Sequence, residues 1–155
     1  MKTLIFKIEI KSIPNKIWNS LWNYDNYSKW TMPFAEGCYY ETSSFSEGAE
    51  INFLSSNGDG MLSKIVTLRP NEFVAFQHLG MITNGEKSFF KVEINNHRYL
   101  ETYQLIQNGT STTLIATVDT LEPWVKTMNI AFPKALKIVK EISEFSTFKD
   151  GIRTH

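Results

Sequence analysis

Two side chains of this sequence combine a reactive group with a position that could bring it to a bound molecule. The first, His78, is in phase with Val74 and Phe76 along a predicted strand, so its imidazole points inward if that face does. An inward imidazole could bind a polar ligand group or exchange protons near neutral pH. The alternative is a hydrogen-bonded histidine of the core or its rim, and both interpretations stay open.

The second side chain, Glu101, lies two positions from Tyr99 and from Tyr103, so all three share one face of a strand. If that face lines an apolar cavity, the carboxyl is in a setting typical of general acids and bases. If it is the outer face of a sheet, Glu101 is a solvent-exposed charge. His78 and Glu101 are therefore weak catalytic candidates.

No known catalytic signature accompanies these residues. The sequence has no G-x-S-x-G, no P-loop and no G-x-G-x-x-G segment, and Gly58-Asp59-Gly60 fits a hairpin turn. The single cysteine, Cys38, has no histidine near it in the sequence to activate it. No spacing of His, Asp and Glu matches a metal-ligand pattern, so we predict neither a metal site nor a cofactor.

Aromatic residues make up 14% of the 155 residues, and phenylalanine alone occurs 11 times. Such a surplus suits a roomy apolar cavity, although aromatic side chains fill an ordinary core equally well. If there is a cavity, its ligand would be apolar or aromatic, with tyrosine hydroxyls to orient it. The side chains predicted to line it are Tyr40, Phe53, Met61, Phe76, His78, Phe90, Tyr103, Trp124, Met128 and Phe132.

Charge and cysteine content narrow the class of protein. Basic and acidic side chains number 16 each, and no basic stripe offers phosphate contacts, so we expect no nucleic-acid partner. The alternating N-terminal segment lacks the apolar core of a signal peptide, and no stretch is apolar enough to span a membrane. One cysteine excludes an intrachain disulfide and fits a reducing compartment, which predicts a cytoplasmic protein without a membrane partner.

Periodicity predicts the elements that position these residues. Residues 2–11 alternate as a strand with one buried face does. Pro14 then begins a short helix of about 14–22, and Asn23 can cap a second one of about 24–30. Turn signals such as Asn-Gly separate the later strands. These are predicted at 38–45 (a short one), 49–55, 61–69, 72–80, 97–107 and 110–121.

Residues 81–96 fit more than one structure. They could form a long loop, or a hairpin around Asn84-Gly85 that ends in a strand near 88–94. Their role could be that of a lid, an extra strand or the contact of a homodimer, so the sequence leaves the oligomeric state open.

The last predicted element is an amphipathic helix from Glu122 to Ser146. Pro133 lies inside it, and because proline removes a helix hydrogen bond we expect a kink or break there. Residues 147–155 are polar and expected to fray, which leaves a single domain over residues 1–146. The apolar residues of the helix recur every three or four positions, at Trp124, Met128, Phe132, Ala135, Val139 and Ile142.

Several landmarks occur in a characteristic order. They are Ile13-Pro14 before Ile17-Trp18, Tyr27 and Trp30 after the second helix, Gly48, Val66-x-Leu68-x-Pro70 before Phe73-Val74-Ala75-Phe76, and Gly109-x-x-Thr112-x-Leu114. In this order the chain resembles the helix-grip superfamily of START domains, birch-pollen-allergen proteins and polyketide cyclases. It is most similar to the bacterial branch related to the C-terminal domain of the activator of heat-shock protein 90 ATPase.

The resemblance covers roughly residues 2–145 and implies an α+β helix-grip fold. A curved antiparallel sheet of six or seven strands would surround a long C-terminal helix, with two short helices after the first strand. An apolar cavity would lie between sheet and helix. The short helices would close one end of the sheet, with Trp30 as a structural anchor.

Three functions are compatible with this fold, because a fold does not fix a function. The first is the binding of a small hydrophobic ligand in the cavity. The second is a cyclase or dehydratase type of enzyme that uses His78 or Glu101 as acid or base. The third is a chaperone-interacting stress protein.

Overall fold

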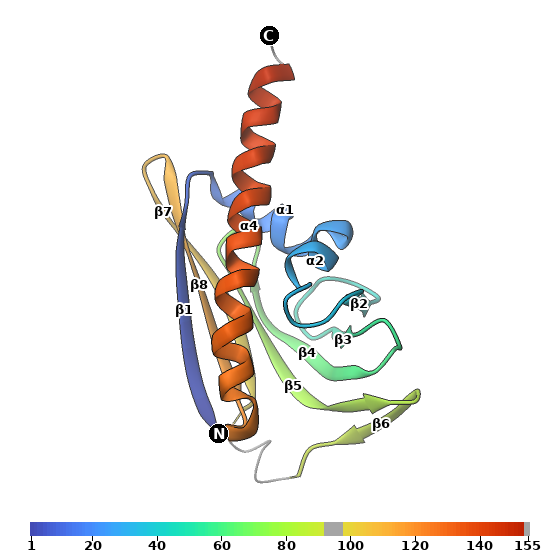
Figure 1. Ribbon diagram of the computed structural model, residues 1–155. Helices are drawn as coiled ribbons and strands as arrows, with labels where there is room; N and C mark the ends of the chain where they lie inside the picture. The colour runs from blue at the N-terminus through green and yellow to red at the C-terminus, as the bar shows by residue number, and fades with distance from the viewer. Residues whose placement is uncertain (92–97, 154–155) are drawn as a thin grey trace.

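The fold is an antiparallel sheet curved around one long helix (Figure 1). The computed structural model describes residues 1–91 and 98–153. In chain order the elements are β1 (Lys2–Ile10), α1 (Pro14–Trp22), α2 (Tyr24–Trp30), β2 (Tyr39–Thr42), β3 (Glu50–Leu54), β4 (Gly60–Arg69), β5 (Phe73–Thr83), β6 (Glu86–Phe89), β7 (Leu100–Asn108), β8 (Ser111–Thr120), the 3-10 turn η1 (Glu122–Trp124) and α4 (Val125–Arg153).

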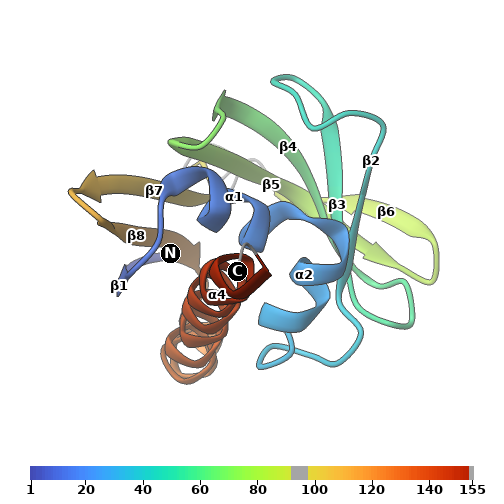
Figure 2. The ribbon, with the colours of Figure 1, turned by 90° about the horizontal axis from the view of Figure 1, so that it is seen from above.

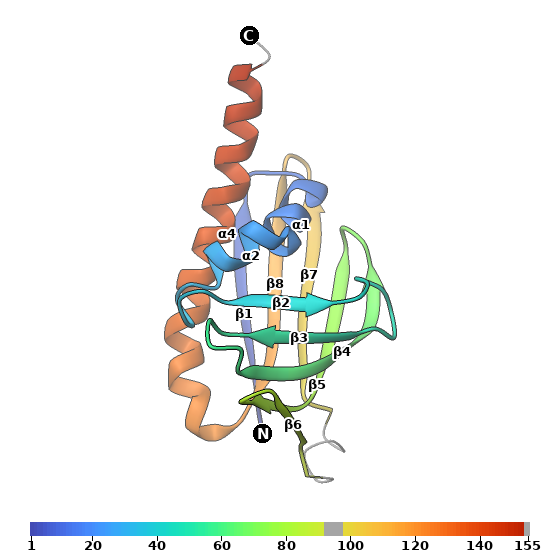
Figure 3. The ribbon, with the colours of Figure 1, turned by 90° about the vertical axis from the view of Figure 1, so that its right-hand side faces the viewer.

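The strands form one sheet in the order β1-β8-β7-β5-β4-β3-β2, and β6 pairs with β5 outside this path. Figure 2 shows the sheet curving around α4, with α1 and α2 on the same side as that helix. In Figure 3, α4 runs past the β1 edge while β2 to β5 continue away from it. Each helix buries its apolar side against the sheet, which confirms the predicted α+β helix-grip architecture.

Within the described residues the sheet has eight strands, where six or seven were predicted. The additional strand is β6, which forms a hairpin with β5 around Asn84-Gly85. Both turn residues have positive φ, at 52° and 79°, as a two-residue hairpin loop requires. The end of the predicted 88–94 strand and the beginning of the predicted 97–107 strand lie outside the described residues.

The two short helices close one end of the sheet. Pro14 begins α1, and the Asn23 side chain caps α2 by accepting hydrogen bonds from two backbone N–H groups. Trp30 is only 1% exposed, and its Nε1 donates to the Leu21 carbonyl at 2.8 Å. This hydrogen bond satisfies the indole while its rings pack against Trp22 and Tyr103.

The long helix α4 is continuous through Pro133, so the predicted break is wrong. Asn129 and Pro133 are both exposed, so water can hydrate the Asn129 carbonyl that loses its helical partner. The helix continues to Arg153, beyond the predicted end at Ser146. The boundary of the domain at residue 146 stays a prediction. No helix in the described part of the chain is long and apolar enough to cross a membrane.

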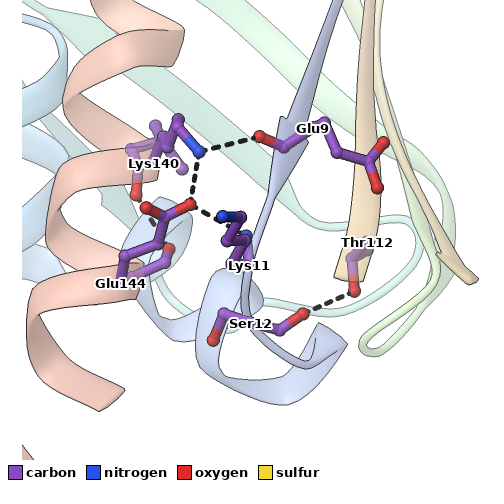
Figure 4. Close-up of polar contacts among 8 residues, drawn as sticks. Glu9, Lys11, Ser12, Thr112, Lys140 and Glu144 are labelled. Carbon is purple, nitrogen blue, oxygen red and sulfur yellow. Dashed lines mark hydrogen bonds and ion pairs between the residues drawn. The ribbon is translucent and has the colours of Figure 1, made fainter. Parts of the chain in front are cut away.

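Polar contacts fasten the later part of α4 to β1 (Figure 4). Lys140 Nζ donates to the Glu9 carbonyl at 3.2 Å and pairs with Glu144. The Glu144 carboxylate also accepts the Lys11 N–H at 2.8 Å. Burial alone would raise the pKa of Glu144, but the hydrogen bonds from Lys140 and the Lys11 N–H hold it below its ordinary value.

Candidate ligand-binding cavity

A cavity of about 320 Å³ lies between the sheet and the first part of α4. Protein interiors are close-packed and contain few voids larger than a water molecule, so an opening of this size is not incidental. Its walls come from α2, β5, β7, β8 and the beginning of α4, which are far apart in the sequence. The volume is at the lower end of the range found for small-molecule pockets, roughly 300–1,000 Å³.

Most of the predicted side chains line this cavity, and two do not. Phe76 is fully buried in the core, and Tyr40 uses its hydroxyl to donate to the Trp22 carbonyl. Glu101 lies on the wall as well. The predicted residues that line the cavity are Phe53, Met61, His78, Phe90, Tyr103, Trp124, Met128 and Phe132.

Other lining residues were not predicted as ligand contacts. Tyr99 had a usable signal in the sequence, because it directly precedes β7 and lies two positions from Glu101. No sequence signal placed the end of β8 or the loop after α2 on the cavity, since their position relative to it depends on how the sheet curves. The unpredicted lining residues are Tyr27, Trp30, Thr31, Phe34, Cys38, Met81, Tyr99, Val118, Asp119, Thr120 and Leu121.

Four polar side chains form a hydrogen-bonded chain across β4, β5 and β7. Ser63 Oγ lies 2.6 Å from His78 Nδ1, and His78 Nε2 lies 3.1 Å from Glu101 Oε1. The Tyr103 hydroxyl donates to the other oxygen of Glu101. The two sequence candidates, His78 and Glu101, are therefore direct partners.

The members of this chain differ in access to the cavity. The Glu101 side chain is 22% exposed, whereas that of His78 is 4% exposed and Ser63 is fully buried. An ionised carboxylate only accepts hydrogen bonds, so His78 Nε2 carries a proton in this pair. Glu101 is thus the more accessible of the two side chains to a ligand, and His78 holds its carboxylate in place.

Neighbouring tyrosines remain neutral hydroxyls. Burial, followed by the negative charge of Glu101, raises the pKa of both Tyr27 and Tyr103 well above the usual value. Burial and Glu101 also raise the pKa of Tyr99. The cavity therefore offers neutral phenols beside one accessible carboxylate.

Cys38 lies on the wall without the setting of a nucleophile. Burial raises its pKa, and although hydrogen bonds with the Thr31 side chain and the Ala35 backbone oppose this, the thiol form is favoured. Within residues 1–91 and 98–153, no three His, Cys, Asp or Glu side chains gather where a metal ion could bind. The accessible chemistry of the cavity is that of a carboxylate, hydroxyls and aromatic rings.

The fold occurs in solved structures of low sequence identity. Protein MLL2253 from Mesorhizobium loti superposes with a TM-score of 0.70 at 14% identity, over 92% of this chain and 97% of that one. The Aha1 dimer from Colwellia psychrerythraea gives 0.63 at 23% identity, over 91% and 95%. DynU16, from the dynemicin biosynthetic locus, gives 0.66 at 11% identity, and the match covers 93% of this chain but 48% of DynU16.

These likenesses define the class of protein as one with a helix-grip fold. No family model matches the sequence, and no curated protein is significantly similar to it. At such identities the shared property is the fold alone, so function has to be argued from the cavity itself.

Proposed function

We propose that this protein binds a small hydrophobic or aromatic molecule in the cavity between the sheet and α4. The observation that carries the proposal is a cavity of about 320 Å³ with mostly aromatic and methionine walls in an otherwise packed core. Apolar walls with a few converging polar groups are typical of sites that bind small molecules.

The exposed side chains on the wall mark the mouth of the cavity. Trp124 is 54% exposed at the end of η1, and Met81 is exposed on β5. Met128, one turn into α4, is half-buried between them and the interior. A ligand would enter past these three side chains and place its apolar part among Phe53, Tyr103 and Phe132.

Uptake of a neutral apolar dye tests the proposal. N-phenyl-1-naphthylamine should gain fluorescence with the wild-type protein and be displaced by smaller aromatic compounds. Met128→Trp adds bulk at the mouth and should weaken uptake by about tenfold or more, a loss of about 1.4 kcal/mol. Ile130→Trp makes a similar change on the outer face of α4 and should leave uptake unaltered.

Native mass spectrometry of gently purified protein complements the dye experiment, because a retained ligand would appear as added mass. Absence of dye uptake together with an unliganded mass would contradict the proposal.

A second candidate function is acid–base catalysis of the cyclase or dehydratase type. It is favoured by the accessible carboxylate of Glu101, which His78 and Tyr103 hold in place. With any substrate identified through binding, Glu101→Gln should abolish turnover while the melting temperature stays near that of the wild type. Turnover by this variant would exclude Glu101 as the acid or base.

We also propose that the chain forms a homodimer in the cytoplasm. The Colwellia psychrerythraea structure is that of a dimer, and Phe89 on β6 is 69% exposed here. Phe89→Asp should convert a dimer into a monomer in sedimentation velocity, whereas Ile106→Asp, exposed on β7, should not. A wild-type protein that sediments as a monomer would contradict the assembly, and cell fractionation tests the location.

A further inference from the structure

We infer that the cavity selects a ligand in which a protonated amine is attached to an aromatic or apolar body. This inference rests on the proposed binding function and specifies the chemical class of the ligand. Its basis is the placement of acceptors and negative charge on a wall that is otherwise aromatic.

Glu101 is the anchor for the amine. Its carboxylate has about four lone-pair positions, and its hydrogen-bond partners His78 and Tyr103 contact one oxygen each. The side chain still has accessible surface on the cavity, so its remaining acceptor capacity points to a ligand. An N⁺–H donor makes a shorter and stronger hydrogen bond to a carboxylate than a neutral donor does.

The wall carries a net negative charge. Asp119 is the second acidic residue on it, and its oxygens accept the Thr3 hydroxyl at 2.6 Å and the Leu100 N–H at 2.9 Å. Among the described residues, those that line the cavity include no lysine and no arginine. If His78 is neutral, no positive charge on the described wall balances the two carboxylates. If His78 is protonated, it balances one of them, and one negative charge remains. Either state repels an anionic ligand and attracts a cationic one.

The aromatic walls add to the same preference. Ring faces carry partial negative charge, so tyrosine, phenylalanine and tryptophan surfaces attract an ammonium group. Such rings line the same cavity as the carboxylate, among them Tyr27, Phe53 and Tyr103. The same rings can stack on the aromatic body of the ligand, so both parts of an arylalkylamine find matching surfaces.

Three indole compounds of similar shape test the inference in titration calorimetry at pH 7. Tryptamine is cationic, tryptophol is neutral and indole-3-propionate is anionic. We expect tryptamine to bind about tenfold more tightly than tryptophol, and indole-3-propionate about tenfold more weakly, a step of about 1.4 kcal/mol each. Glu101→Gln should bring the ratio of tryptamine to tryptophol affinity close to one. Glu41→Gln removes the same charge from the exposed face of β2 and should preserve the ratio.

The outcomes separate this inference from the proposed function. If tryptophol binds as well as tryptamine, or if the dye binds and no indole does, the amine preference is wrong and the binding function stands. If neither the dye nor any indole binds, the binding function fails as well. If circular dichroism shows that Glu101→Gln is unfolded, the order of affinities of the three compounds for the wild-type protein tests the amine preference by itself.

Discussion

The two parts of α4 meet the sheet in different ways. From Ala131 onward the helix buries Ala135, Leu136, Val139 and Ser143 in the core. Before Ala131 no residue of the helix is buried, and Met128 faces the cavity. One helix thus contributes stability with its later turns and covers the cavity with its first turns.

Hydrogen bonding follows the same division. The later part is fastened to β1 through Lys140 and Glu144, and Ser143 Oγ contacts Ser20 Oγ of α1 at 2.8 Å. These contacts show that the cavity is not a result of loose packing along the whole helix. The cavity lies at one end of a helix that is fastened by hydrogen bonds at the other.

The largest expected effect is at Trp30, which belongs to the core and to the cavity wall at once. Trp30→Ala removes a fully buried indole and should lower the free energy of unfolding by about 3–5 kcal/mol in urea titrations. Trp30→Phe should cost less, because it keeps a buried ring. Unchanged stability with loss of dye uptake would mean that Trp30 serves the ligand rather than the fold.

Leu136 tests the anchored part of α4. Because the side chain is buried, Leu136→Ala should lower the free energy of unfolding by about 2–4 kcal/mol and leave the affinity for the dye nearly unchanged in the folded variant. Ile130→Ala, on the exposed side of the helix, is the matched control and should change stability by less than about 0.5 kcal/mol. If Leu136→Ala and Ile130→Ala changed the free energy of unfolding equally, the distinction between the two parts of α4 would be wrong.

The ionisation of Glu144 predicts how the stabilising contact between α4 and β1 depends on pH. Its folded-state pKa is lowered, so its stabilising effect is present above the ordinary value of 4.5 and is lost as the pH falls below it. Glu144→Gln should destabilise the protein at pH 7 by about 0.5–1 kcal/mol, since the pair is partly exposed.

Urea titrations from pH 7 to pH 3 measure this dependence. The difference in stability between wild type and Glu144→Gln should shrink towards the acidic end. Exposed Glu141, changed to Gln, serves as the control and should give a small difference at every pH. A difference that grows on acidification would show that the carboxylate is not stabilised by Lys140 and the Lys11 N–H.

The smallest effect on stability is expected for Trp124, at the mouth of the cavity. Trp124→Ala should change the free energy of unfolding by less than about 0.5 kcal/mol, because the side chain is mostly exposed. The same variant should weaken dye uptake severalfold, since an aromatic wall is lost. Phe145→Ala, on an exposed position of the anchored part, should alter neither quantity.

Local periodicity predicted most elements and several wall residues. The alternation of Tyr99, Glu101 and Tyr103 needed only neighbours in the chain, and the structure places all three on the cavity. Asn-Gly turns likewise predicted hairpins, although the sequence left the one at Asn84-Gly85 undecided. Such signals are local, and therefore a single sequence contains them.

What the sequence could not predict depends on curvature and depth. His78 and Glu101 looked equivalent as candidates, yet only Glu101 has appreciable access to the cavity. Phe76 has the same phase as His78 but lies deeper, in the core. The alternation of side chains along a strand shows which face each residue is on. It does not show how far each residue lies from the cavity, because that distance depends on the bend of the whole sheet.

The hydrogen-bonded chain from Ser63 to Tyr103 also has a consequence for strand alignment. Ser63 and His78 are opposite one another in the β4–β5 ladder, and the His78 N–H donates to the Tyr99 carbonyl on the neighbouring chain segment. A slip of β5 by one residue would turn His78 to the convex face and leave Ser63 and Glu101 without this partner. The residues that give the cavity its polarity therefore also penalise misaligned sheets, so a substitution that alters the polarity of the cavity would also alter the accuracy with which the strands align.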